Sequence, residues 1–206
     1  MNLETLFVRE KEEFDELKEL VSDMLFSDDN LPQQVFREQF SHYLFEEFDW
    51  AMSDEFWDTI QKLAEQAKDD FILTAVLNPH PVNYYYKEFG YFNWAKLPIN
   101  LSADDYFNVL ELGPNESPAD AILFNSDTVV WLSPSGKWAI WGERAYGICV
   151  LALKEPINTI NSSLFLKTWR SIDNEAVMNW VGLNFKGRKV PKEVTDALYM
   201  NYSNKI

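Results

Sequence analysis

The chain has 206 residues, of which 47% are hydrophobic and 16% aromatic, so it can bury a sizeable core without metal or disulfide staples. Its 33 acidic and 18 basic side chains give a formal charge of −15, which excludes an electropositive surface over most of the molecule. Residues 1–70 hold twenty acidic and six basic side chains, whereas residues 156–206 hold four acidic and seven basic ones. A one-signed surface of this kind attracts cationic partners and repels nucleic acid and anionic membrane.

The single cysteine and the N-terminal composition indicate a cytoplasmic protein. Cys149 cannot form an intramolecular disulfide, and its apolar neighbours predict a buried thiol. Residues 1–19 interrupt their apolar positions with charges, unlike a signal peptide. No apolar run approaches the ~20 residues that span a bilayer. We therefore expect a reducing compartment and no membrane attachment.

The first seventy residues predict three helices with acidic faces. Apolar residues recur at three- and four-residue steps between Phe7 and Phe26, as in an amphipathic helix. Pro32 can open a second helix that continues to about Phe48, again with helical apolar spacing. Ser53 has the character of an N-cap for a third helix, because acidic residues follow in the first turn. Together they predict an acidic N-terminal helical lobe.

Residues 71–155 predict mainly β-structure. Phe71–Leu77 is short, apolar and terminated by prolines, which favours a buried strand, and Ser102 begins a helix reaching about Leu112. Four further runs are separated by connections too short for parallel crossovers, so they predict an antiparallel meander. These runs are 121–124, 129–132, 138–141 and 146–153.

The tail, residues 156–206, returns to helical spacing over 164–172, 174–183 and 191–202. The whole chain is thus predicted to be a single α+β domain, with an antiparallel sheet flanked by helices. The basic residues Lys186, Arg188, Lys189 and Lys192 lie together in this tail. They could bind an anion or neutralise part of the acidic lobe.

No motif for catalysis, metal or cofactor binding is present. The two histidines, His42 and His80, make a poor metal pair, and no second cysteine supports them. Phosphate-cradling and dinucleotide-binding glycine motifs are missing, as is a nucleophile elbow. We expect no catalytic residue, no metal and no cofactor, with a Ca²⁺ or Mg²⁺ site built from carboxylates alone as the minor alternative.

Residues 84–94 contain seven aromatics in eleven positions. Two interpretations remain open for this aromatic segment. Its rings could form a platform for a small ligand, with Tyr84, Tyr86, Tyr91 and Trp94 as the candidate residues. The alternative, which we favour, is a strand pair or loop whose alternate rings enter the core.

The segment 133–144 reads Ser-Pro-Ser-Gly-Lys-Trp-Ala-Ile-Trp-Gly-Glu-Arg and precedes an apolar strand. Trp138 and Trp141 would lie on opposite sheet faces, so one would be exposed or covered by a helix. Over about twenty residues this hairpin resembles that of several immunity proteins from bacterial polymorphic and contact-dependent toxin systems. The resemblance implies a small acidic cytosolic inhibitor that binds a toxin domain and has no catalytic residues.

Charge and resemblance together predict a binding protein for a basic toxin or nuclease domain. Two alternatives are a DNA mimic that inhibits a DNA-processing protein, and a ligand-binding or enzymatic domain that uses the aromatic segment 84–94. Direct nucleic-acid binding is not expected, and the sequence leaves a homodimer open. The candidate partner-binding residues are Glu46, Glu47, Asp49, Asp54, Glu55, Asp58, Trp138, Trp141 and Arg144.

Overall fold

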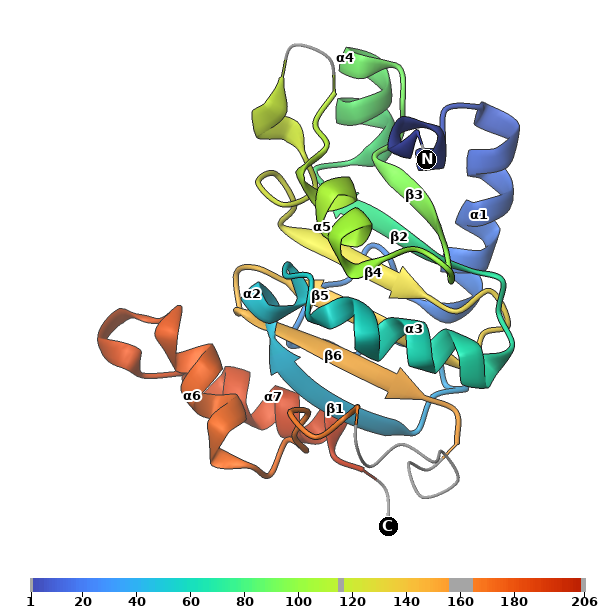
Figure 1. Cartoon of the computed structure of the whole chain (residues 1–206). Helices are drawn as coiled ribbons and strands as arrows, with labels where there is room; N and C mark the ends of the chain where they lie inside the picture. Colours follow the sequence, from blue (N-terminus) through green and yellow to red (C-terminus); the bar gives the residue numbers. More distant parts are fainter. Residues whose placement is uncertain (1, 115–116, 156–164, 205–206) are drawn as a thin grey trace.

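The computed structural model describes residues 2–114, 117–155 and 165–204 (Figure 1). Its centre is a six-stranded sheet with the order β1-β6-β5-β4-β2-β3, in which every neighbouring pair is antiparallel. This confirms the predicted α+β class, with the antiparallel meander in β4–β6. The strands are β1 (His42–Glu47), β2 (Phe71–Asn78), β3 (Trp94–Pro98), β4 (Thr128–Leu132), β5 (Trp138–Glu143) and β6 (Ile148–Leu153).

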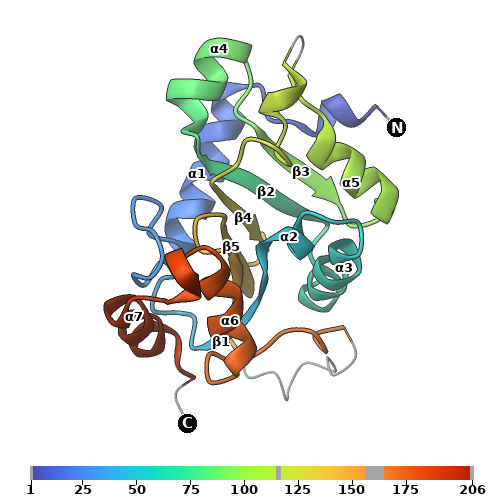
Figure 2. The same ribbon diagram turned by 90° about the vertical axis from the view of Figure 1, so that its left-hand side faces the viewer.

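Helices cover both faces of the sheet. Figure 1 looks onto the face that carries α2, α3 and α5, and Figure 2 shows the sheet between α1 on one side and α3 and α5 on the other. The α-helices are α1 (Lys11–Met24), α2 (Phe48–Ala51), α3 (Phe56–Ala67), α4 (Lys87–Phe89), α5 (Ala103–Glu111), α6 (Glu175–Leu183) and α7 (Lys192–Tyr202). Shorter helical turns are η1 (Leu3–Leu6), η2 (Pro81–Tyr86), η3 (Pro118–Asp120) and η5 (Lys186–Arg188).

Each face of the sheet has its own hydrophobic core. The first contains Trp138 and the apolar faces of α3 and α5, and the second contains Trp141 with those of α1, α6 and α7. Alternate residues of one strand enter different cores because successive side chains point to opposite faces. A sheet covered on both sides has strands that are buried along their whole length, and the burial of β4, β5 and β6 follows this rule.

Several sequence predictions for helices are confirmed. The predicted amphipathic helix between Phe7 and Phe26 is α1, which buries Phe14, Leu17 and Val21 on the sheet. The cap of α5 is Ser102, whose side chain accepts the backbone N–H of Asp105 at 3.1 Å. The third predicted helix exists as α3, but it begins at Phe56 rather than after Ser53. The hydroxyl of Ser53 instead donates to the carbonyl of Trp50 at 2.7 Å.

Three other predictions are wrong. The second helix of the predicted acidic lobe is absent, because 42–47 forms the strand β1 and pairs with β6. Residues 121–124 form turns rather than a strand, and Phe124 is 60% exposed. The helix predicted over 164–172 is not formed in its described part, 165–172, which contributes an isolated bridge between Arg170 and Phe45. Residue 164 lies outside the described residues.

Both edges of the sheet are covered by other segments of the chain. Phe45 of β1 donates its N–H to the carbonyl of Arg170 at 2.7 Å and accepts the N–H of Arg170 at 2.9 Å. At the other edge, Val8 donates its N–H to the carbonyl of Trp94 in β3 at 2.8 Å. Exposed edges invite strand addition, and these contacts protect both. The surfaces left for a partner are therefore mainly those of the helices and turns.

Candidate functional site

The candidate site is the outer surface of α2 and α3, which follow directly after β1. We call Glu47, Asp49, Asp54, Glu55 and Asp58 the α2–α3 acidic surface. The chain has no lysine or arginine between Arg37 and Lys62, so Lys62 is the one cation within α2 and α3. It lies on the sheet face that Figure 1 presents to the viewer.

Four of these carboxylates are exposed and Glu47 is half-buried. Asp58 pairs with Lys62 one turn along α3, at 2.6 Å, with both side chains largely in solvent. Such an exposed pair stabilises little, about 0.3–0.5 kcal/mol. Within the described residues the other four carboxylates form no ion pair. The surface therefore keeps most of its negative charge for an external partner.

Trp50 lies within this acidic surface and was missed by the sequence analysis. Its ring is half-buried and makes edge-to-face contacts with Phe56 at 5.4 Å and with Trp169 at 6.3 Å. The indole N–H points to Glu55 Oε2, 3.4 Å away. The available signal was a tryptophan between acidic residues in a segment without cations. Partly exposed tryptophans held rigidly by neighbours are frequent anchors of protein interfaces.

Glu46, a predicted partner-binding residue, is buried instead. It is 4% exposed and pairs across the sheet with Cys149, and burial raises the pKa of its carboxyl. Oε1 accepts the backbone N–H of Glu47 at 2.9 Å, whereas Oε2 has no hydrogen-bond partner in the described part of the chain. Desolvation is the larger effect on this pKa, although Thr168 and Arg170 lower it in part, so the ionised form of Glu46 costs folding free energy.

Trp138 and Trp141 are also buried, at 2% and 0% exposure, so neither lies where a partner could touch it. Helices cover both faces of the sheet, so each of these tryptophans is covered and neither is exposed. The indole N–H of Trp141 donates to Glu143 Oε2 at 3.0 Å. Burial raises the pKa of Glu143, which also accepts the backbone N–H of Leu31 at 3.0 Å.

Arg144 is half-buried and holds the chain together internally. Its Nε donates to the carbonyl of Ser126 and an Nη donates to the carbonyl of Leu123, both at 2.9 Å. The guanidinium also lies over the ring of Phe48, 4.7 Å from its centroid. These contacts hold the guanidinium against two loop carbonyls and a core ring, so we assign Arg144 a structural role.

The four candidate residues of the aromatic segment do not share one pocket. The hydroxyl of Tyr84 donates to Asp120 at 2.6 Å, and the buried Trp94 donates to the carbonyl of Val76 at 2.8 Å. Tyr86 stacks on Phe92 at 4.5 Å on the α1 face of the sheet. Tyr91 belongs to the opposite core. Of the rings in 84–94, those of Tyr85, Tyr91, Phe92 and Trp94 are buried, whereas Tyr86 is 40% exposed, and the first part of the segment forms η2 and α4 rather than a strand pair or loop.

The basic residues of the tail do not neutralise the acidic N-terminal residues in the described structure. Lys186, Arg188 and Lys189 are exposed around η5, and Lys192 pairs with Asp196 one turn along α7. Figure 1 shows this segment standing out from the body of the molecule. It remains a solvated, positively charged projection.

The described residues offer no obvious chemistry. None of their His, Cys, Asp and Glu side chains form a group of three or more that could hold a metal ion. Cys149 is fully buried, and burial raises the pKa of its thiol, so the nucleophilic thiolate is disfavoured. His80 Nδ1 accepts the N–H groups of Val82 and Asn83 and caps η2. No helix among the residues described is long and apolar enough to cross a membrane.

Comparison with known proteins gives no family assignment, because no family model, curated protein or solved structure matches the chain. The resemblance of residues 133–153 to immunity proteins stays a prediction.

Proposed function

We propose that the chain is a non-catalytic cytoplasmic binding protein that inhibits a basic toxin or nuclease domain through the α2–α3 acidic surface. The observation that carries this proposal is the group of unpaired carboxylates around the half-buried Trp50. Charge attracts the partner, and the aromatic ring gives it a fixed contact. This is the division of roles typical of electrostatically steered protein pairs.

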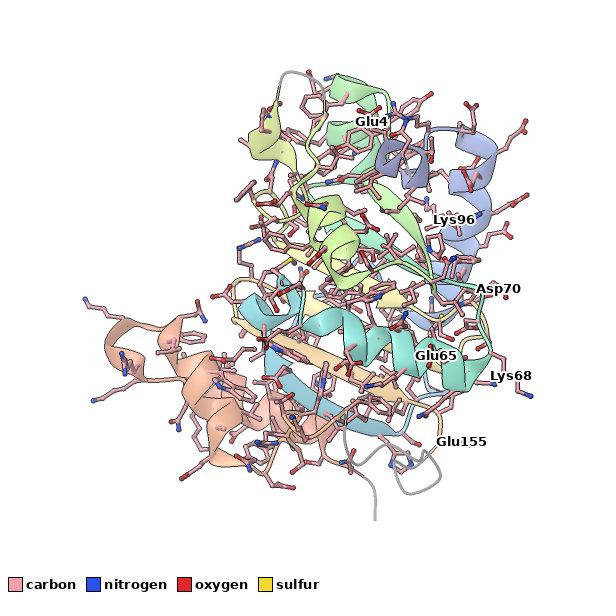
Figure 3. The ribbon with its side chains drawn as sticks, in the orientation of Figure 1. Glu4, Glu65, Lys68, Asp70, Lys96 and Glu155 are labelled. Carbon is pink, nitrogen blue, oxygen red and sulfur yellow. The ribbon has the colours of Figure 1, made fainter. Side chains whose placement is uncertain are left out.

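The acidic face of α1 is the weaker candidate for the same role. Lys11 and Lys18 interrupt its acidic residues, and Lys96 reaches Glu13 from β3 at 2.9 Å. Figure 3 shows Lys96 beside α1. The exposed carboxylates of α1 are therefore partly compensated by cations. The α2–α3 acidic surface has five carboxylates against Lys62, a formal excess similar to that of α1, and it differs from α1 in holding the half-buried Trp50 among its carboxylates.

The buried carboxyl of Glu46 is a second reason to favour the α2–α3 acidic surface as the binding surface. Glu46 is buried next to Glu47 of this surface, and desolvation raises its pKa even though Thr168 and Arg170 favour its ionised form. A cationic group placed above it would stabilise the ionised carboxylate, because an opposite charge offsets the desolvation cost. Binding of a basic partner and ionisation of Glu46 are thus expected to reinforce one another.

The test is capture of basic proteins from a lysate of the source cell, followed by purification of the retained protein and an assay of its toxicity or nuclease activity. Inhibition of that activity at stoichiometric ratio supports the proposal. The matched variants are Asp49→Asn/Asp54→Asn/Glu55→Gln on α2–α3 and Glu12→Gln/Glu16→Gln/Glu19→Gln on α1. They change the formal charge equally on opposite faces of the sheet. Equal inhibition by wild type and the α2–α3 variant would contradict the proposal.

Duplex DNA separates this proposal from a DNA mimic. A mimic occupies the DNA-binding channel of its target, so excess duplex should displace it, and its binding should weaken steeply with salt. An inhibitor that contacts another surface of a toxin or nuclease resists displacement by duplex. Competitive displacement would therefore assign the chain to the mimic class.

A further inference from the structure

A cavity unrelated to the α2–α3 acidic surface lies among η1, α4 and the end of α5. Its volume is about 260 Å³, and its walls include Glu4, Phe7, Arg9, Glu88, Phe89 and Tyr91. Drug-sized ligands occupy cavities of about 300–1,000 Å³, so this cavity suits a smaller molecule. Figure 3 shows Glu4 on η1 beside α4, at one end of the molecule.

Tyr91 provides an unsatisfied polar group in this wall. The residue is 4% exposed and packs edge-to-face against Phe7 at 5.5 Å. Burial raises the pKa of its phenol, so the group stays a neutral donor and acceptor at physiological pH. Its hydroxyl has no hydrogen-bond partner among the residues described. Buried tyrosine hydroxyls usually have a partner, and a bound molecule could supply one here.

Charged groups of both signs line the same cavity as Tyr91. Arg9 is exposed, lies 6.0 Å from the centroid of the Tyr91 ring, and pairs with no carboxylate in the described ranges. Glu4 likewise forms no ion pair there, and Glu88 is 4.0 Å from Lys87 with both side chains mostly in solvent. The cavity thus offers a guanidinium suited to a carboxylate and two carboxylates suited to an ammonium group.

We propose that this cavity binds a free α-amino acid with an apolar side chain. The ligand carboxylate pairs with Arg9, its ammonium group pairs with Glu4 or Glu88, and its side chain packs against Phe7 and Phe89. The hydroxyl of Tyr91 completes its hydrogen bonding with the ligand head group. A zwitterion matches the mixed charges, which a simple anion or cation would match only in part.

Isothermal titration with L-leucine and L-phenylalanine tests the ligand class directly. The expected dissociation constant is about 1 mM or lower, which is within reach for a ligand of this size. N-acetyl-L-leucine lacks the ammonium group and L-leucinamide lacks the carboxylate, so each should bind at least about tenfold more weakly. The proposal is overturned if none of the twenty amino acids binds, or if either derivative binds as tightly as L-leucine.

Two variants locate the binding in this cavity. Arg9→Met should weaken leucine binding at least about tenfold, because the paired cation is lost. Tyr91→Phe keeps the ring in the core and removes only the hydroxyl, so it should weaken binding without unfolding the protein. The control is Arg188→Met, an exposed arginine at η5. Wild-type affinity in Arg9→Met and Tyr91→Phe would place the amino acid elsewhere and contradict the assignment.

Discussion

Replacing Arg144 by methionine separates a structural role from a partner-binding role for this residue. Methionine keeps an unbranched apolar side chain but removes the guanidinium. Two carbonyl groups, those of Ser126 and Leu123, then lose their donor, and the ring of Phe48 loses its cation. We therefore expect Arg144→Met to destabilise the fold and to leave the α2–α3 acidic surface unchanged.

The size of the effect follows from these contacts. A hydrogen bond to a charged group contributes about 1.5–3 kcal/mol when buried, and about 1 kcal/mol is reasonable for each bond of a half-buried arginine. The cation–π contact adds about 0.5–1 kcal/mol. The free energy of unfolding should thus fall by about 2–3 kcal/mol, measured by urea denaturation at pH 7. Arg188→Met, an exposed control, should change it by less than about 0.5 kcal/mol.

The stability and the partner affinity of Arg144→Met together distinguish a structural role from an interface role. A loss of stability with unchanged partner affinity, measured where the variant is fully folded, confirms the structural role. An unfolding free energy within about 0.5 kcal/mol of wild type, together with lost partner binding, would refute the reasoning and restore Arg144 as an interface residue.

Three further predictions concern residues near the candidate site. Burial raises the pKa of Glu46 above 4.5, so the folded protein holds a proton that the unfolded chain releases, and stability falls as pH rises through this window. Glu46→Gln should therefore increase the free energy of unfolding at pH 7, and the gain should shrink toward zero below pH 4.5; exposed Glu65→Gln should show neither effect. Cys149 should react with a thiol reagent only at the rate of unfolding, and rapid labelling of the native protein would contradict its burial. Trp50→Ala should weaken partner binding by about 2 kcal/mol, roughly thirtyfold in Kd, whereas Trp180→Ala, another half-buried tryptophan, should leave it unchanged.

Local sequence patterns predicted the elements that bury only one face and those whose ends are marked by a capping residue or a short turn. Helix α1 has one apolar face, and Ser102 caps α5 with its own side chain. The meander of β4–β6 has short connections that allow only antiparallel pairing. In each case the information lies within about fifteen residues of sequence.

The strand β1 could not be recognised in this way. Its pairing partner β6 is more than a hundred residues away, and both of its faces are buried, so the alternation of apolar and polar residues is lost. The apolar residues of the segment 35–48 recur at intervals that also fit a helix. The prediction for residues 121–124 was wrong for another reason, because four apolar residues are too few to distinguish a strand from a turn.

The candidate site was predicted in part. Asp49, Asp54, Glu55 and Asp58 are exposed, as a charged segment predicts. The burial of Trp138 and Trp141 depends on helices α1, α3, α6 and α7, which come from distant parts of the chain. Sequence patterns show that these tryptophans point to opposite faces but not that both faces are covered. Trp50 was overlooked because no motif distinguishes it from a core residue, although the acidic residues around it were visible in the sequence.

The most direct test of the proposed function is the association rate constant of the purified partner at several ionic strengths. With wild type it should fall steeply as salt rises, because steering by exposed charge is screened. The variant Asp49→Asn/Asp54→Asn/Glu55→Gln should reduce this rate about tenfold or more at low salt and flatten its salt dependence. The α1 variant Glu12→Gln/Glu16→Gln/Glu19→Gln should stay within about twofold of wild type. Equal effects of the two variants, or no salt dependence, would contradict binding through the α2–α3 acidic surface.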